Sequence, residues 1–252
     1  MINYFNWINS PFLPEYGNVL WGCTTFVDDA IEEVIRNQGG IAAIAISHPH
    51  ELYSYAKWAV MFNSPVVIHE RDKDLIEFNS DFITTWSGEE FPLAPHITLI
   101  RLGGHYDGGA VLHWNNNQGV VQDGKGVLLC SDMLQVGIDG RTVSIMRSYN
   151  NCVPLSGVDA RRIRQKLSGV HFDRMYASGN HRDLLVNAKR MTLSSLSKYA
   201  AAIERPREDV DGRGFLRIPS VLALQAAPSI AQAGESSRQA GESSHQVRSL
   251  AT

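Results

Sequence analysis

The chain has 252 residues, 44% of them hydrophobic and 19% charged, a balance typical of a globular protein with a sizeable core. Its formal net charge of -3 provides no basic stripe for a phosphate backbone, so we expect a small-molecule substrate and no nucleic-acid partner. Three scattered cysteines exclude a disulfide framework. No apolar run is long enough for a membrane span and the N-terminus lacks a signal-peptide pattern, so the expected location is cytoplasmic.

Over the first 102 residues, short runs of β-branched and apolar residues alternate with patterns of helical period. In chain order the predicted elements are an irregular lead-in (1–16), a strand (18–21), a helix (between 28 and 39), a strand (41–46), a helix (52–60), a strand (65–69), a helix (72–78) and a strand (97–102). This alternation is typical of a fold that mixes strands with helices.

The second part of the domain contains a hairpin pattern, in which a polar loop rich in Asn, Gln and Gly separates two strands. Its predicted elements are strands (110–114 and 126–130), a strand (142–146), a helix (158–167), a strand (172–177) and a long amphipathic helix (182–203). Hairpins between mixed elements favour two sheets packed face to face with helices outside. The predicted fold class is therefore α/β (α+β), a four-layer αββα sandwich over residues 17–205.

The C-terminal segment differs in composition from the rest. The string Ala233–Gln239 is followed at once by a near copy, Ala240–Gln246, built from small and polar residues. Such a segment buries too little apolar surface to offset the entropy of ordering. We therefore predict that residues 206–252 form a linker and a disordered tail, and that His245 belongs to the repeat and binds no metal.

Residues that commonly bind metals follow several of the predicted strands. They are His48 and His50 after the strand at 41–46, His105 after a Gly-Gly turn, Asp132 after the strand at 126–130, and His181 after the strand at 172–177. Strand ends of a sandwich share one edge, so these side chains can meet around one ion. Three histidines and a carboxylate suit zinc, iron or manganese. In the structural alternative, the His-Pro-His string is a polar loop and Asp132 and His181 are turn residues.

Around these residues the chain resembles the metallo-β-lactamase-fold superfamily of metallohydrolases, over residues 17–204. His48 and His50 match the first two histidines of the HxHxDH signature, His105 the next histidine and Asp132 the metal-bridging aspartate. The string Ile46–His50 is similar, more narrowly, to an uncharacterised metallohydrolase-like branch with an ISHPH motif. The resemblance also implies further sequence before the strand at 18–21, so we expect the first sheet to lack an edge.

The chain departs from the family pattern at three positions. Leu52 and Tyr53 stand where the signature has Asp and His, which normally hold a second metal. Gly22 stands where the family has an acidic residue in a Trp-Asp-Cys string. We therefore expect a reduced site with one metal.

The resemblance implies a metal-dependent hydrolase with one divalent ion, zinc foremost and iron or manganese as alternatives. A metal-bound hydroxide would attack an ester, thioester, lactone or related bond, with Asp132 as a ligand or as the general base. One alternative is a catalytically degenerate binding or scaffold protein, which the residues at 22, 52 and 53 favour. Another is a calcineurin-like metallophosphoesterase, prompted by the string Gly179–Asp183, but no Gly-His-x-His string follows it.

Overall fold

The computed structural model describes residues 6–8, 17–76, 81–115, 125–179 and 182–204. The chain divides into two units, residues 1–205 and 206–252, and the described residues all belong to the first. The predicted disordered tail, most of the hairpin loop and His181 lie outside the described residues.

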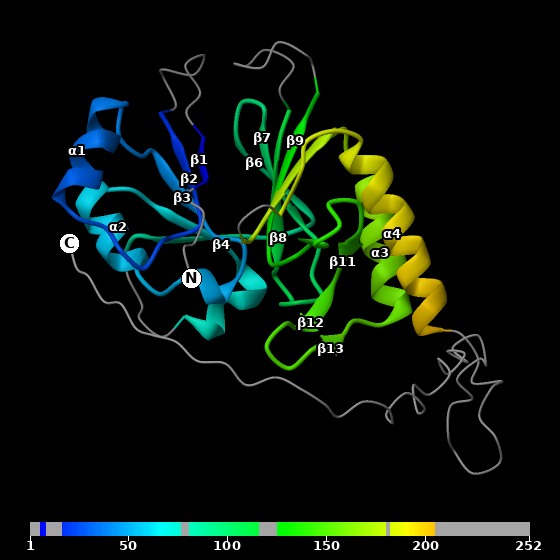
Figure 1. Ribbon diagram of the computed structural model, residues 1–252. Helices are drawn as coiled ribbons and strands as arrows, with labels where there is room; N and C mark the ends of the chain where they lie inside the picture. Colours follow the sequence, from blue (N-terminus) through cyan, green and yellow to red (C-terminus); the bar gives the residue numbers. More distant parts are fainter. Residues whose placement is uncertain (1–5, 9–16, 77–80, 116–124, 180–181, 205–252) are drawn as a thin grey trace, which may run out of the picture. The chain divides into compact units, whose positions relative to one another are not determined.

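Two sheets form the centre of the first unit (Figure 1). The first has the order β1-β2-β3-β4-β5, with β1 (Asn6–Ile8), β2 (Val19–Trp21), β3 (Ala43–Ala45), β4 (Val66–His69) and β5 (Ile83–Trp86). Strands β2 to β5 are parallel, and β1 is antiparallel to β2. The stretch expected to be an irregular lead-in therefore contains a strand, which pairs with β2.

The second sheet has the order β15-β14-β9-β8-β7-β6 and is antiparallel except between β9 and β14. Its strands are β6 (Glu90–Ala94), β7 (Ile97–Arg101), β8 (Ala110–Trp114), β9 (Val127–Ser131), β14 (Arg174–Ala177) and β15 (Asp183–Leu184). Two small antiparallel pairs follow β9 in the chain: β10 (Gln135–Val136) with β11 (Val143–Ser144), and β12 (Met146–Ser148) with β13 (Val153–Pro154).

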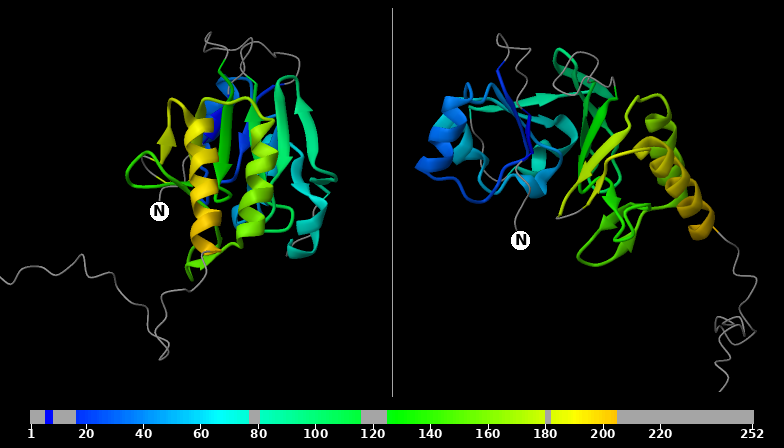
Figure 2. Two further views of the ribbon diagram at one scale, coloured as in Figure 1. Left: turned by 90° about the vertical axis from the view of Figure 1, so that its right-hand side faces the viewer. Right: turned by 45° about the horizontal axis from the view of Figure 1, so that its top comes forward.

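Helices cover the outer face of each sheet, as the two views in Figure 2 also show. The helices are α1 (Asp29–Asn37) and α2 (Tyr55–Phe62) on the first sheet, and α3 (Gly157–Ser168) and α4 (Ala188–Ile203) on the second. Side chains of Asp28 and Ser156 accept hydrogen bonds from backbone N–H groups in the first turns of α1 and α3, which explains where these helices begin. The predicted αββα order is confirmed. Within the described residues no helix has the length and apolar character needed to cross a membrane.

Three apolar layers hold these elements together. Ile44 and Trp58 are buried between the first sheet and its helices, Leu99 and Leu129 between the two sheets, and Leu128 between the second sheet and its helices. Leu128 and Leu129 are neighbours in β9 and lie in different layers, because successive side chains of a strand point to opposite faces. The central strands are therefore apolar on both faces, which explains their uninterrupted hydrophobic runs.

The structure corrects the predicted elements at several points. Strands β5 and β6 were not predicted, and the exposed Thr84 and Thr85 in β5 account for its weak apolar signal. The helix predicted from residue 182 begins at Ala188, because residues 183–184 form β15 and pair with β14. The helix predicted at 72–78 is a 3₁₀ helix, η2 (Glu70–Leu75).

We expect Leu99→Ala to lower the free energy of unfolding by about 2–5 kcal/mol, since its side chain is 0% exposed between the two sheets. Urea unfolding followed by tryptophan fluorescence measures the change. Ile138→Ala is the matched control, because Ile138 is 93% exposed and its truncation should change the free energy by less than about 0.5 kcal/mol. Equal effects of the two substitutions would contradict the layer arrangement.

Candidate metal centre

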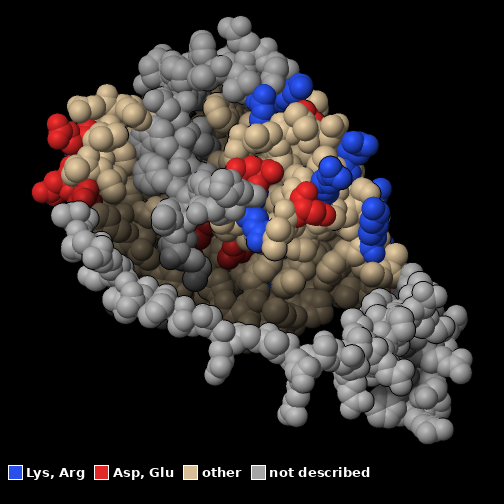
Figure 3. All heavy atoms as spheres, in the orientation of Figure 1, with Lys and Arg blue, Asp and Glu red and all other residues tan. Residues whose placement is uncertain are grey.

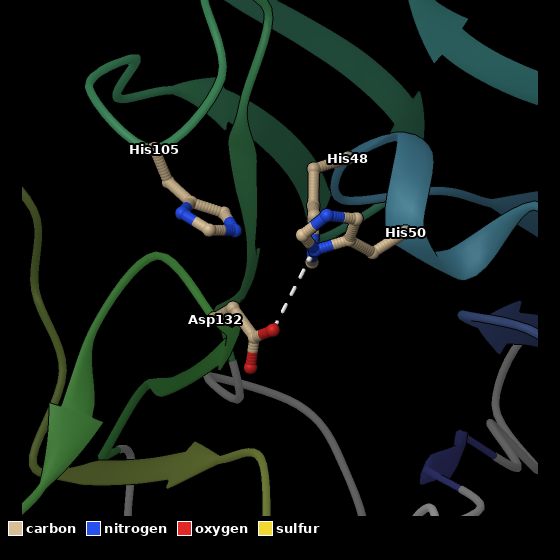
Figure 4. Close-up of side chains that lie close together, drawn as sticks. All are labelled: His48, His50, His105 and Asp132. Atoms are coloured by element: carbon tan, nitrogen blue, oxygen red, sulfur yellow. Dashed lines mark ion pairs between the residues drawn. The ribbon is translucent and has the colours of Figure 1, made fainter. Parts of the chain in front are cut away.

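Four side chains converge where strands of both sheets end. His48, His50, His105 and Asp132 each offer one ligand atom, and these atoms lie within 4.8 Å of one another. Figure 4 shows the four side chains turned toward one another, with Nε2 of His48 3.6 Å from Oδ2 of Asp132. The structure thus brings together four of the five predicted site residues, and the fifth, His181, lies outside the described residues.

The end of β3 places the first two histidines. Ser47 follows this strand and connects it to β8 of the other sheet: its hydroxyl donates to the carbonyl of Ala110 at 2.7 Å, and its own carbonyl accepts from the N–H of Ala110 at 3.0 Å. His48 comes next and is buried. Pro49 then begins the 3₁₀ helix η1 (Pro49–Glu51), whose turn directs the exposed His50 toward the same point.

A Gly-Gly turn after β7 places His105. Gly104 has a φ of +100°, and a Cβ atom there would lie 2.9 Å from Cδ1 of Leu155, so this turn requires glycine. Nδ1 of His105 donates to the carbonyl of Arg147 at 2.9 Å. Because a carbonyl only accepts hydrogen bonds, the Nε2 atom of the neutral ring keeps its lone pair for a ligand.

Tyr106 orients His50 and was not predicted from the sequence. Its hydroxyl is 2.8 Å from Nε2 of His50, which leaves Nδ1 as the nitrogen available to an ion. The Tyr106 ring also stacks on His48, with centroids 5.6 Å apart and planes inclined by 30°. Its position next to His105 is the one sequence signal that could have identified it.

The protonation states suit a cation. Burial alone would raise the pKa of Asp132, but His48, the Ser178 hydroxyl and His105 outweigh it and lower the pKa to about 2. Desolvation, with a contribution from His48, lowers the pKa of both His50 and His105. Neutral imidazoles and an ionised carboxylate are the forms that bind metals.

Unpartnered nitrogens support the same interpretation. Among the described residues, both ring nitrogens of His48 and Nε2 of His105 are buried without a hydrogen-bond partner. A buried polar atom without a partner costs about 1–3 kcal/mol, so folded proteins rarely leave several in one place. A divalent ion bound to the ring nitrogens would remove much of this cost. The donor set therefore fits a divalent metal.

The positions of the missing ligands contribute no donor to this cluster. Leu52 is partly buried against the apolar layer beneath α1 and α2, and Tyr53 is 77% exposed. Gly22 has no side chain, but the carboxyl group of Glu51 lies against it. Sequence reasoning missed Glu51, although it directly follows His50.

The comparisons with known proteins give one sequence relative. No protein-family model matches the chain. Over 159 residues the chain is 43% identical to the uncharacterized protein YmaE of Bacillus subtilis (strain 168), an alignment that covers 63% of this chain. The chain spans 57% of the length of that relative.

Solved structures identify the fold. The metallo-β-lactamase of Staphylococcus aureus subsp. aureus COL superposes with a TM-score of 0.53 at 10% identity, over 81% of this chain and 67% of that one. The protein TTHA1623 in a di-iron-bound form gives a TM-score of 0.50 at 13% identity, over 71% and 87%. A metallo-β-lactamase of Cronobacter sakazakii gives 0.50 at 15% identity, over 79% and 85%. The described part of the chain therefore has the metallo-β-lactamase fold, as predicted.

Tyr106→Phe should weaken zinc binding about tenfold, because it removes the hydroxyl that orients His50 while it keeps the aromatic contacts. Competition with a chromophoric chelator measures the dissociation constant. Tyr53→Phe removes an exposed hydroxyl from a neighbouring tyrosine and should leave the constant unchanged. Unchanged zinc affinity in Tyr106→Phe would contradict the orienting role.

Proposed function

We propose that this protein is a metal-dependent hydrolase with a mononuclear site formed by His48, His50, His105 and Asp132. The observation that carries the proposal is the convergence of these four donors within 4.8 Å. Both ring nitrogens of His48 and Nε2 of His105 are buried without a hydrogen bond to the described residues. Zinc is the metal that this nitrogen-rich set favours, with iron or manganese as alternatives. His181 is proposed as a further ligand on its sequence position alone.

The residues of the site have separate roles in this proposal. When bound, a divalent ion would lower the pKa of a coordinated water and polarise a substrate carbonyl. His48 and His105 hold the buried side, while the exposed His50 and the partly exposed Asp132 leave an open side for a substrate. Asp132 has a pKa of about 2 and is a weak base, so its principal role is to bind the metal and orient the attacking water by accepting its hydrogen bond.

The proposed substrate is a small molecule with an ester, thioester, lactone or related bond. The face in Figure 3 carries Lys and Arg over the side of α3 and α4 with Asp and Glu among them, a mixed distribution that gives little attraction to a polyanion. We also propose membership of the branch with the ISHPH motif, on the string Ile46–His50. A cytoplasmic location remains a prediction.

A second candidate function is a binding or scaffold protein that keeps the fold without catalysis. The observation that favours it is the lack of a donor at Leu52, Tyr53 and Gly22, which leaves the cluster with four donors among the described residues. Metal binding and turnover distinguish the two functions.

Purified protein should bind about one zinc ion per chain, and His50→Ala should lose most of it. Because His50 is exposed, its truncation should leave folding intact. Elemental analysis by mass spectrometry after dialysis gives the stoichiometry, and His171→Ala, an exposed histidine outside the cluster, is the control. Substoichiometric zinc that both variants retain equally would contradict the metal site.

Removal of the metal should abolish hydrolysis of a panel of acyl esters, thioesters and lactones, and added zinc should restore it. Initial rates with and without a chelator measure the effect. A parallel panel of phosphodiesters distinguishes acyl from phosphoryl substrates. A protein that binds zinc stoichiometrically but hydrolyses neither panel would favour the scaffold function.

A further inference from the structure

We propose that Glu51 is a positioning residue of the metal centre and supplies from a new position the carboxylate that is missing at Gly22. The proposal rests on the proposed function, because it concerns ligands of the same site. Glu51 is the last residue of η1, directly after His50, and is partly buried. It does not belong to the group of four donors, so its effect on the metal is exerted through other residues.

The carboxylate of Glu51 connects two candidate ligands. Its Oε2 atom accepts from the backbone N–H of Ser47 at 3.0 Å, and its Oε1 atom accepts from the hydroxyl of Ser131. Ser47 immediately precedes His48, and Ser131 immediately precedes Asp132. Ser47 lies just after β3 and Ser131 is the last residue of β9, and these strands belong to different sheets. One side chain thus joins the strand ends that deliver His48 and Asp132.

The hydrogen bond from Ser131 to Glu51 also supports an unfavourable backbone conformation at Ser131. Its φ of +47° lies in the left-handed region, which is unfavourable for residues with a side chain. The buried hydroxyl of Ser131 is the group that Glu51 contacts, so the hydrogen bond stabilises the backbone turn from which Asp132 projects. Groups that orient metal ligands from outside the coordination shell typically change metal affinity by about 10–100-fold when they are removed.

The space around Gly22 explains why the two positions are coupled. Gly22 follows β2, and a Cβ atom there would lie 3.2 Å from Cδ and from both carboxylate oxygens of Glu51. The Glu51 carboxyl group therefore occupies the space into which a side chain at position 22 would project. A carboxylate at 22 would push the Glu51 carboxyl group out of its present position, because the two groups would crowd this space and repel. The Glu51 carboxyl group therefore stands where an acid at position 22 would project.

A double-mutant cycle tests the exchange on the full chain. Glu51→Ala should weaken zinc binding about 10–100-fold. Gly22→Asp alone should also weaken it, whereas the double variant Gly22→Asp with Glu51→Ala should bind at least about tenfold more tightly than Glu51→Ala. Aspartate is the suitable replacement, since Gly22 has a φ of +74° and Asp tolerates that region better than most residues. Chelator competition gives the zinc affinities, and the absorption spectrum of the cobalt-substituted protein reports the ligand geometry.

The control variant is Glu32→Ala, which removes the ion pair with Arg36 within α1 and should leave zinc affinity unchanged. Urea unfolding of the metal-free variants separates loss of the site from loss of the fold. If Glu51→Ala does not fold, Glu51→Gln replaces it and should weaken binding less, since its amide oxygen still accepts one hydrogen bond.

The outcomes separate this inference from the proposed function. Wild-type protein that binds no zinc would overturn the proposed function itself. Wild-type protein that binds zinc, together with Glu51 variants of equal affinity and unchanged cobalt spectrum, would overturn the positioning role alone. A double variant as weak as the sum of its single changes would overturn the exchange between positions 22 and 51.

Discussion

The reciprocal hydrogen bonds between Ser47 and Ala110 join the two sheets at the edge where the candidate metal centre lies. Both residues are buried, so water does not compete for these bonds. Ser47 follows the end of β3 and Ala110 opens β8, which means that each sheet constrains the position of the other at this point. His48 follows Ser47 directly, and its ring can meet His105 and Asp132 of the second sheet only while this register is kept.

The convergence of donors has a cost for the metal-free fold. Three imidazole rings lie with centroids 5.0 to 5.3 Å apart, and buried nitrogens of two of them have no hydrogen-bond partner among the described residues. A core of the same shape built from apolar residues would be more stable. Proteins keep such locally unfavourable arrangements where function requires them. The three apolar layers of the sandwich provide the stability that offsets this cost.

Much of the fold could be predicted from the sequence, because the central strands are buried on both faces and have uninterrupted apolar runs. Strand β5 escaped prediction since Thr84 and Thr85 are exposed, and β15 because two residues are too few for a pattern. The four converging donors follow the ends of strands, and this position in the sequence allowed them to be predicted as candidate ligands. Glu51 and Tyr106 directly follow His50 and His105, but their contacts with Ser131 and His50 join segments that are distant in sequence and carry no sequence pattern.

The backbone after His50 explains why positions 52 and 53 contribute no donor to the cluster. The turn of η1 directs Leu52 into the apolar layer beside α2, and Tyr53 points to solvent with 77% of its surface exposed. Leu52 therefore contributes to the apolar packing and Tyr53 to the surface. Position 51, directly after His50, provides the Glu51 carboxylate. An acid at 51 turns toward Ser131 and Gly22 instead of toward the converging histidines. The same short helix thus places one of the four converging donors, His50, and a carboxyl group that joins the ends of strands from both sheets.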